Sequence, residues 1–571
     1  MEYLCTTGAA KEMDVPGNEH IRPLTLPHMR IQNLTAFLLC SLCTHAQQWN
    51  WAVDAGGTGN TDFCWGIASD SQGNVYLAGS ISGPADFGCA TLAPPEIVGT
   101  LAKYDSMGTC LWARDISTTF DATWAYGVAI DAEDHIYVTG SYDGNATFGN
   151  GVTLNSLGGD DIFLARYDTD GNCVWARRAG SNGSDDEARD VAVGTSGDVY
   201  ITGISGGFSI GFDTISIPNP INYRQVVIAC YDSTGAVQWA RGTTGNGQGK
   251  TAQAIAVRND RLYITGLMGY TAASYDGLAI TPNASSSNLY VLACDLDGEG
   301  LWARAFGHGD NEGMGINADT LGNVFVTGRF TGTMVLPTGD PLVCASIEED
   351  IVLMRLDTAG GFHWALRAGS LQRDVGWDVE TDGLGNVYVA AHFEQTIDFL
   401  GTPLTSFGEE DILLARVDQW GNAQWVKQGG AVSRDVPIAI HRSAVGSRPL
   451  YTGGYSWGTV TYGSSTIVDV ANGDAMLIQL SDTTAVDFST AVPTPEDYAL
   501  QVFPSPATDH IFIRAVQPVQ ELWLVSALGA QQGVRHDPSG AIDVRALPAG
   551  LHLLRAVLAD GRVVCTPFVK E

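Results

Sequence analysis

Four aspartates recur at one position of a repeated pattern, where their carboxylates could hold a metal ion. Each stands just before a short apolar run, and three follow a second acid (Asp160, Glu349 and Glu410); the four are Asp161, Asp350, Asp411 and Asp474. Carboxylates and loop carbonyls are the ligands that Ca²⁺ prefers, so one interpretation is a set of calcium sites. The other is that each aspartate caps its own turn by accepting backbone N–H groups. The spacing matches no known calcium loop, and we favour turn capping.

A second recurring position has the composition of a ligand site. It lies just ahead of an apolar strand and is occupied in order by Trp65, Tyr126, Arg189, Gln253, Met314, Trp377 and Val436. Three residues further along, most repeats have a small residue, but two have Asn317 and Glu380. Aromatic rings mixed with hydrogen-bonding side chains are typical of sites for a sugar or a peptide. We therefore predict a binding site made by Trp65, Tyr126, Arg189, Gln253, Trp377 and Glu380; the alternative is drift at an exposed loop.

Other motifs do not indicate catalysis. Two Gly-x-Ser-x-Gly matches, 203–207 and 454–458, occupy the same repeat position at the end of a strand, whereas a nucleophile elbow needs a strand-to-helix turn. The histidines at 135, 308, 363, 392 and 441 are scattered and show no metal-ligand spacing. No pair of carboxylates stands out in the sequence, although distant repeats could assemble one.

The elements that must position these residues are copies of one unit. A Trp-Ala-Arg motif or a close variant recurs seven times, 61 to 64 residues apart, at Trp51, Trp112, Trp175, Trp239, Trp302, Trp364 and Trp425. One unit contains four short β-rich runs bounded by Asp, Gly and Asn, at 127–131, 136–140, 162–168 and 173–177. Seven such sheets bury their faces only by stacking in a ring. We therefore predict an all-β, seven-bladed propeller of four-stranded antiparallel blades over residues 47–488.

This ring places the residues introduced above. The first strand of each blade lines the central channel, so the variable aromatic and polar position is expected near the channel mouth. The recurrent tryptophan is expected to pack as an apolar wedge between neighbouring outer strands.

The ends of the repeat array indicate how the ring closes. The first tryptophan strand, 48–53, has no three strands before it, and the last three strands (438–440, 450–453 and 476–480) have no tryptophan strand after them. We expect the N-terminal strand to complete the seventh blade, which removes a free edge. A weak strand at 486–488 is the competitor for the same place.

Charge and hydropathy restrict the partners. The chain has 63 acidic and 30 basic residues, a formal net charge of −33 and a pI near 4.4. Such a surface repels phosphate backbones, so nucleic acid is not an expected partner. The sequence has no transmembrane span of 18 or more apolar residues. We expect a monomer whose acidity is compatible with divalent cations and with solubility outside the cell.

The N-terminal region has the pattern of an export signal. Residues 29–46 combine a basic start, an apolar centre and a small-residue exit, with cleavage expected after Ala46. Residues 1–28 match neither a signal nor the repeat, so we interpret them as a non-native extension. Eight cysteines follow Ala46 without any Cys-x-x-Cys spacing. We favour small buried thiols, and the pairing of any disulfides stays open.

At this point the repeat can be compared with a known family. The run Asp-Ile-Phe-Leu-Ala-Arg-Tyr-Asp-x-x-Gly-Asn-x-x-Trp-Ala-Arg, joined to Gly-Asn-Val-Tyr-x-Thr-Gly, resembles the bacterial SBBP β-propeller repeat. The resemblance covers roughly residues 47–488. It implies a propeller fold and a secreted or surface location, and the family has no general catalytic assignment.

The C-terminal region resembles a second family. After a linker at 489–497, the words at 502–513, 522–529, 542–550 and 551–570 resemble, in order, the type A C-terminal sorting domain of the type IX secretion system of Bacteroidota. Ser505 and His552 depart from that pattern, where Asn and Tyr are usual. The resemblance implies that residues 498–571 form a small β-sandwich that interacts with the export machinery. The protein would then be released or anchored at the cell surface.

The sequence is compatible with three functions. We favour a secreted or surface scaffold without catalytic activity that binds a glycan or a protein. The second is a propeller enzyme, a polysaccharide lyase or hydrolase, using Arg189, Glu380 and Asp374 near the channel mouth. The third is a structural surface module without a small ligand.

Overall fold

A computed structural model describes residues 47–482 apart from short gaps at 60–61, 246–248, 283–285, 308, 384, 447 and 470–472, together with segments between 500 and 570. The predicted extension 1–28, the signal segment 29–46, the competing strand 486–488 and the linker 489–497 lie outside the described residues. The described residues are all-β, and among them no helix is long and apolar enough to cross a membrane.

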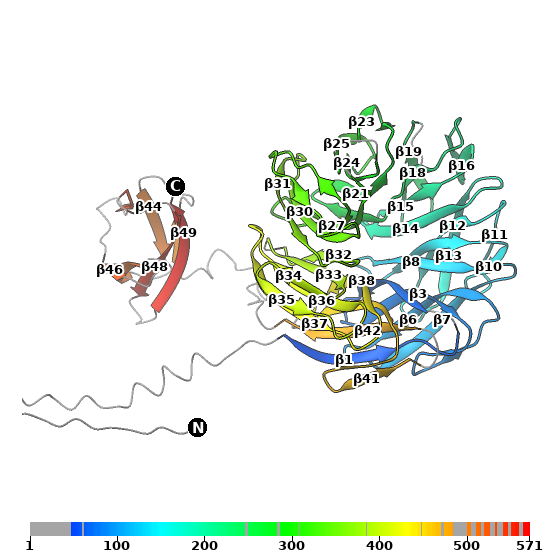
Figure 1. The fold of residues 1–571 in the computed structure, drawn as a ribbon, viewed down its shortest axis with the longest axis horizontal. Helices are drawn as coiled ribbons and strands as arrows, with labels where there is room; N and C mark the ends of the chain where they lie inside the picture. Colours follow the sequence, from blue (N-terminus) through cyan, green and yellow to red (C-terminus); the bar gives the residue numbers. More distant parts are fainter. Residues whose placement is uncertain are drawn as a thin grey trace, which may run out of the picture. The chain divides into compact units, whose positions relative to one another are not determined.

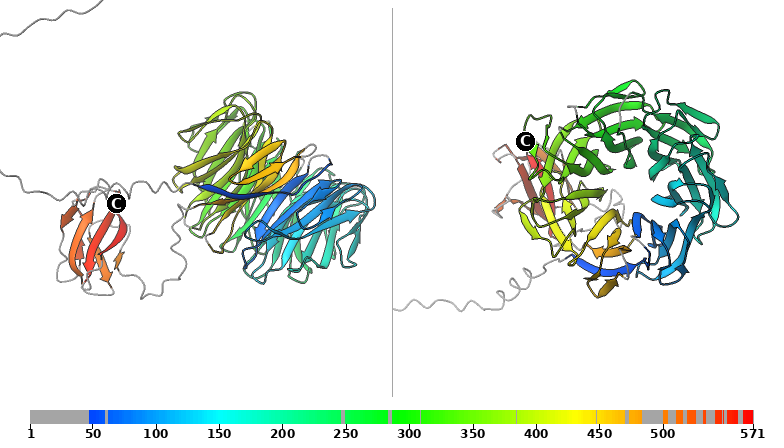
Figure 2. Two further views of the ribbon diagram at one scale, coloured as in Figure 1. Left: turned by 90° about the horizontal axis from the view of Figure 1, so that it is seen from below. Right: turned by 45° about the vertical axis from the view of Figure 1, so that its right-hand side comes forward.

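Seven four-stranded antiparallel sheets form a ring, seen nearly face-on in the right view of Figure 2. The first four blades consist of β2 (Phe63–Ser69), β3 (Val75–Ser82), β6 (Ile97–Tyr104) and β7 (Cys110–Thr118); β8 (Thr123–Ile130), β9 (Ile136–Tyr142), β12 (Asp161–Tyr167) and β13 (Cys173–Gly180); β14 (Asp186–Val193), β15 (Val199–Ser205), β18 (Gln225–Tyr231) and β19 (Val237–Gly242); and β20 (Ala254–Arg258), β21 (Arg261–Met268), β24 (Asn288–Asp295) and β25 (Gly300–Phe306).

The remaining three blades consist of β26 (Asn311–Ala318), β27 (Asn323–Phe330), β30 (Asp350–Asp357) and β31 (Phe362–Ala368); β32 (Val375–Thr381), β33 (Val387–Phe393), β36 (Asp411–Val417) and β37 (Ala423–Gly429); and β38 (Asp435–Arg442), β39 (Leu450–Ser456), β42 (Asp474–Ser481) and β1 (Gln48–Asp54). The predicted fold class is therefore confirmed. Figure 1 shows β1 beside β42 in the last blade.

The ring closes as the ends of the repeat array predicted. The N-terminal strand β1 pairs antiparallel with β42, from Gln48 opposite Ser481 to Asp54 opposite Met476. The last blade thus takes three strands from the end of the repeat array and one from its beginning. Because both ends of the propeller share one sheet, neither can peel away without breaking that ladder.

Each blade also contains a small hairpin that the sequence did not reveal. It lies between the second and third strands of the blade. The seven hairpins are β4 (Ala85–Asp86) with β5 (Thr91–Leu92), β10 (Asn145–Thr147) with β11 (Thr153–Asn155), β16 (Ser209–Phe212) with β17 (Ile215–Pro218), β22 (Ala273–Tyr275) with β23 (Leu278–Ile280), β28 (Thr333–Met334) with β29 (Leu342–Val343), β34 (Thr396–Phe399) with β35 (Thr402–Thr405), and β40 (Thr459–Tyr462) with β41 (Ser465–Val468). In two of them, β10 and β16 pair with the outer strand of the preceding blade, β7 and β13.

The recurrent tryptophan joins each blade to the next. In six blades its indole Nε1 donates a hydrogen bond, 2.8–3.3 Å long, to a carbonyl in the turn between the third and fourth strands of the following blade. The acceptors are the carbonyls of Ser106, Thr169, Ser233, Leu296, Thr358 and Gln419. This position therefore serves contact between blades, as the sequence analysis favoured.

The turn that accepts the indole hydrogen bond accounts for the Asp and the Gly of the repeat motif. In the turn beginning at Asp168, the aspartate Oδ1 accepts the backbone N–H groups of Asp170 and Asn172. Gly171 has a φ of 78°, and a Cβ there would stand about 3.0 Å from the ring of Trp112 in the preceding blade. Glycine is required because it tolerates this backbone conformation and leaves room for the ring.

The seventh interface lacks this turn. The fourth strand of the last blade is β1, which comes from the other end of the chain, so no turn joins it to β42. The indole Nε1 of Trp425 is correspondingly buried without a hydrogen-bond partner among the described residues. Trp425 therefore joins the sixth and seventh blades through apolar packing, without the indole hydrogen bond.

One pair of cysteines departs from the favoured expectation of buried free thiols. Cys89 and Cys110 of the first blade form a disulfide. Cys64, Cys173, Cys230, Cys294 and Cys344 are free and buried, as favoured from the sequence.

The C-terminal segments form two antiparallel sheets. One contains β43 (Leu500–Phe503), β44 (His510–Ala515) and β47 (Ala541–Asp543), and the other contains β46 (Gln531–Gly533), β45 (Val519–Val525), β48 (Gly550–Leu558) and β49 (Val563–Lys570). Ile511 and Ile542 of the first sheet share an apolar core with Leu522 and Leu554 of the second.

The tryptophan hydrogen bonds lead to a stability prediction. Trp302 and Trp425 are 7% and 8% exposed, but only Trp302 donates its indole N–H, to Thr358. Phenylalanine removes the donor and keeps most of the ring, and a net hydrogen bond contributes about 1 kcal/mol. Trp302→Phe should therefore lower the free energy of unfolding by about 1 kcal/mol more than Trp425→Phe, measured by urea denaturation. Equal losses would contradict a role for the hydrogen bond.

Candidate functional site

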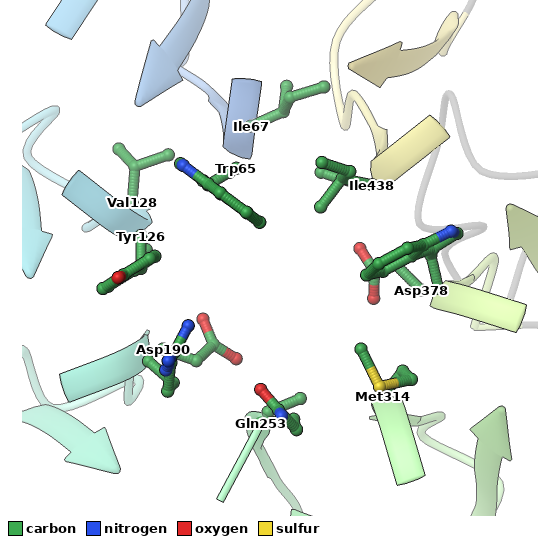
Figure 3. Close-up of a pocket in the computed structure, with 15 residues that line it drawn as sticks. Trp65, Ile67, Tyr126, Val128, Asp190, Gln253, Met314, Asp378 and Ile438 are labelled. Atoms are coloured by element: carbon green, nitrogen blue, oxygen red, sulfur yellow. The ribbon is translucent and has the colours of Figure 1, made fainter. Parts of the chain in front are cut away.

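A cavity of about 150 Å³ opens at one mouth of the central channel. Its lining comes from the first strands of all seven blades and from Gln253, which stands just ahead of β20 in the fourth; Figure 3 shows these side chains converging. The lining includes five of the six residues predicted from the sequence: Trp65, Tyr126, Arg189, Gln253 and Trp377. The structure therefore brings together residues separated by more than 300 positions in the chain.

The local backbone explains why this position points into the channel. In six blades the residue stands within the first strand, at a shift of register between the first and second strands, as between Cys64 and Gly66 or between Gly376 and Asp378. Such a bulge leaves one residue unpaired and redirects its side chain. The prediction that the position precedes the strand is therefore wrong except in the fourth blade, where Gln253 precedes β20.

The bulge also corrects the assignment in the seventh blade. Val436, expected to join the ring, is only 1% exposed. Ile438, at the register shift between Pro437 and Ala439, lines the cavity instead. Val436 stands two residues before Ile438, and a displacement of two residues preserves the alternation of a strand.

The two indoles of the pocket are held in fixed orientations from behind. Trp65 Nε1 donates to Ser80 Oγ at 3.2 Å, and Trp377 Nε1 donates to His392 Nδ1 at 2.8 Å. Ser80 and His392 are buried and occupy the same position of the second strand in their blades. Burial lowers the pKa of His392 to about 3, so the neutral ring accepts this bond. Side chains locked in this way are preorganised for a ligand.

Other aromatic rings and one cation complete this side of the pocket. Phe63 stacks on Trp65 with ring centroids 4.7 Å apart, and Trp65 meets Tyr126 edge-on at 5.6 Å. The Arg189 guanidinium lies 4.4 Å from the centre of the Tyr126 ring and forms an ion pair with Glu187. Burial raises the pKa of Tyr126 to about 12, so its hydroxyl is protonated at neutral pH.

Gln253 is tied to the neighbouring blade. Its Nε2 donates to Glu312 Oε1 at 2.7 Å, and the other carboxylate oxygen of Glu312 pairs with Arg329 at 2.7 Å. The side chain of Gln253 is therefore oriented by a charged network behind the lining.

Two carboxylates of the lining were missed by the sequence analysis. Asp190 and Asp378 follow the bulge residue in the third and sixth blades, where the other blades have Gly or Ala. Burial is the main cause that raises the pKa of Asp190 to about 7 and the pKa of Asp378 well above its usual value. Comparing the seven repeats one position further along would have revealed these two departures.

Glu380, the sixth predicted site residue, lies outside the lining. It belongs to a polar chain across four blades, in which Asn317 Nδ2 donates to Glu380 Oε1 at 3.0 Å and His441 Nδ1 stands 3.6 Å from Glu380 Oε2. His441 Nε2 is in turn 2.8 Å from Ser69 Oγ. Glu380 therefore lies apart from the aromatic residues of the lining, two residues further along β32 than Asp378.

The trio named for an enzymatic site does not converge on the cavity. Of Arg189, Glu380 and Asp374, only Arg189 is part of the lining. Asp374 is fully buried, where its carboxylate accepts the backbone N–H groups of Ser370 and Glu394.

The four recurring aspartates occupy four separate blade junctions. Asp161, Asp350 and Asp411 are fully buried, and each accepts a backbone N–H from four or five residues earlier, at 2.8–2.9 Å. These contacts are those of turn caps. Asp474, in the last blade, lies within electrostatic range of Asp54 and Asp62.

Across each junction a second buried aspartate faces the first. Asp186, Asp374, Asp435 and Asp62 of the following blades are within electrostatic range of Asp161, Asp350, Asp411 and Asp474. Burial, more than this repulsion, raises the pKa of Asp161, Asp374 and Asp435 to about 7. Among the described residues, the one group of three metal-ligand side chains is elsewhere, at Asp131, Glu133 and His135 in a turn of the second blade.

One stretch of the chain matches a repeat family, and parts of the chain are similar to known proteins. Residues 51–88 match the family model described as SBBP, a beta-propeller repeat. The uncharacterized WD repeat-containing protein L264 of Acanthamoeba polyphaga mimivirus is 23% identical over 424 residues, which cover 60% of this chain and 30% of that protein. The regulatory protein FlaEY of Caulobacter vibrioides is 32% identical over 142 residues, which cover 24% of this chain and 15% of that protein.

The chain thus spans less than a third of the length of these curated relatives. Among solved structures, the WD40 domain of Neurospora crassa Pan2 is similar with a TM-score of 0.38 and 9% identity, over 77% of this chain and 97% of that chain. The matched repeat and the seven four-stranded blades together make this chain a β-propeller repeat protein.

The buried aspartates lead to a prediction about pH. A carboxyl with a folded-state pKa near 7 and an unfolded pKa near 3.8 stabilises the fold at low pH, and this contribution is lost as the pH rises through 7. His392 opposes this trend below its unfolded pKa, and aspartates with lowered pKa values, such as Asp70, oppose it only below about pH 4. The midpoint of thermal unfolding should therefore be higher at pH 5 than at pH 8.

A single variant separates turn capping from metal binding. Asp161→Asn keeps an oxygen for the N–H of Leu157 and removes the titrating group. The variant should be more stable than the parent at pH 8 and should show a weaker pH dependence. If Ca²⁺ instead raised the midpoint of the parent and not of the variant, Asp161 would be a metal ligand.

Proposed function

We propose that this protein is an exported binding scaffold without catalytic activity, which recognises a glycan at the channel mouth. The observation that carries the proposal is the pocket of Trp65, Tyr126 and Trp377, in which both indoles are fixed by buried hydrogen-bond partners. Aromatic faces beside a few polar groups are the usual surface for a sugar ring. A residue that only filled space would not need a buried histidine to orient it.

The differences between blades support recognition over a purely structural role. The outer strands repeat the same tryptophan seven times, whereas the channel position holds Trp, Tyr, Arg, Gln, Met, Trp and Ile in turn. A ligand without sevenfold symmetry needs an asymmetric set of contacts. A protein ligand that inserts one side chain into the pocket is the second candidate, because the same surface suits a peptide.

Export through the type IX system is part of the proposal. Residues 29–46 have the pattern of a signal peptide, and the C-terminal words resemble a type A sorting domain, whose expected two-sheet fold agrees with the strands described between 500 and 570. The Cys89–Cys110 disulfide favours an oxidising compartment. The protein would then act in secreted form or at the outer cell surface.

A glycan array tests the binding role. The purified protein should bind a defined set of glycans, and Trp65→Ala or Trp377→Ala should weaken binding by about tenfold or more, since a buried aromatic contact contributes about 1 kcal/mol beyond its area. Trp420→Ala is the matched control, because Trp420 is 71% exposed and lies outside the pocket lining. Loss of binding in all three variants, or no binding by the parent, would contradict a glycan site at this mouth.

Deletion of residues 498–571 tests the export route. In a host with type IX secretion, the parent should appear at the surface or in the medium with Gln47 as its first residue. The deletion variant should accumulate in the periplasm. Cell fractionation and N-terminal sequencing measure both outcomes. Equal secretion of both proteins would contradict the assigned route.

A further inference from the structure

Two carboxylates face the same cavity from different sides of the ring. Asp190 lies on β14 of the third blade and Asp378 on β32 of the sixth, and both side chains point toward the centre of the pocket in Figure 3. Their charges interact, since Asp190 contributes to raising the pKa of Asp378. The channel thus brings two carboxyl groups into one confined volume.

The backbone contacts of the two aspartates leave part of each carboxylate available. Asp190 Oδ2 accepts the N–H of Ile255 at 2.8 Å, and Asp378 Oδ2 accepts the N–H of Ile440 at 3.0 Å. The Oδ1 atoms accept the N–H of the next residue in their own strands. A bound cation favours the ionised form of both groups. An ionised carboxylate has about four acceptor positions, so each would retain about two for that ligand.

Asp190 and Asp378 each bond the backbone of the next blade, but five blades build the same first strand without a carboxylate at this position. The other five blades have Gly66, Gly127, Ala254, Gly315 and Ala439 at the same position and form the same first strand. At Gly66 and Gly315 the backbone of the next blade already fills the place of a Cβ, at 2.9 Å and 2.6 Å. A carboxylate at this position therefore costs desolvation that five blades avoid, which favours a role in binding.

The positive charge already in the pocket is compensated. Arg189 pairs with Glu187 and lies over Tyr126, so it does not neutralise Asp190 and Asp378. A cation between the two carboxylates would relieve their repulsion. The same cation would also face Trp65 and Trp377, and aromatic faces attract cations. The net charge of −33 would raise the local concentration of such a ligand.

We infer that the channel mouth binds the protonated amine of an amino sugar, with Asp190 and Asp378 as its ion-pair partners and Trp65 and Trp377 against the sugar ring. This inference rests on the proposed glycan-binding function and names its ligand class. The cavity of about 150 Å³ has room for one sugar ring, so the terminal residue of a chain would enter it. Flat rings on two sides favour a sugar ring over the flexible stem of a lysine.

The test compares two oligosaccharides that differ only at the amine. The full-length protein is titrated by calorimetry with a β-1,4-linked glucosamine tetramer and with its fully N-acetylated counterpart. The amine form should bind at least tenfold more tightly. Asp190→Asn and Asp378→Asn should each reduce that preference several-fold, because asparagine keeps the size and one acceptor but removes the charge.

A matched variant and an unfolding measurement separate charge from folding. Asp161→Asn also replaces a buried aspartate, but at a blade junction outside the pocket, and it should keep the full preference. Thermal unfolding of every variant shows that the propeller is intact. If the double variant Asp190→Asn/Asp378→Asn still preferred the amine form, the inference would be overturned.

The remaining outcomes distinguish this inference from the proposed function. If the N-acetylated tetramer bound equally or more tightly, and Trp65→Ala abolished that binding, the inferred amine ligand would be overturned and glycan recognition would stand. Binding of a lysine-rich peptide without binding of either tetramer would overturn both and make a protein the ligand. Binding of neither tetramer in an array that contains other bound glycans would overturn the amine alone.

Discussion

The hydrogen bond from a tryptophan indole to a turn of the next blade is the interaction on which the ring depends. A four-stranded sheet is too small to bury both of its faces, so each blade is stable only against its neighbours. The indole supplies apolar area and a directional contact at once, and the receiving turn is shaped for it by an aspartate cap and a left-handed glycine. Because the tryptophan and the turn recur together, six of the seven pairs of successive blades are joined in the same way.

Closure of the ring cannot use the same device. The last turn would have to join the two ends of the chain, so the final interface combines β42 with β1 and leaves the indole of Trp425 without its acceptor. The β1–β42 ladder holds the fourth strand of the seventh blade in place without a connecting turn. The ring therefore depends on the N-terminal strand as much as on any complete blade.

The channel mouth shows the opposite principle, because its residues differ from blade to blade. A bulge in the first strand releases one side chain per blade from the ladder, so that position is free to vary without disturbing the sheet. The second strand supplies a different partner for each bulge residue. Ser80 accepts the indole N–H of Trp65, and His392 accepts that of Trp377. The outer strands thus supply a uniform frame, and the inner strands supply a specific surface.

The sequence by itself determined the number of blades, the strands in each, the closing partner of the N-terminal strand and most of the variable channel position, because a repeat makes equivalent residues comparable. Tertiary structure alone decided which of these side chains meet. Glu380 stands three residues from Trp377 yet lies outside the cavity lining, whereas Asp190 and Asp378 are 188 positions apart and face one cavity. The sequence also could not distinguish Val436 from Ile438, since a shift of two residues keeps the same face of a strand. Contacts across a closed ring depend on register and on curvature, and neither is encoded in the spacing of a single repeat.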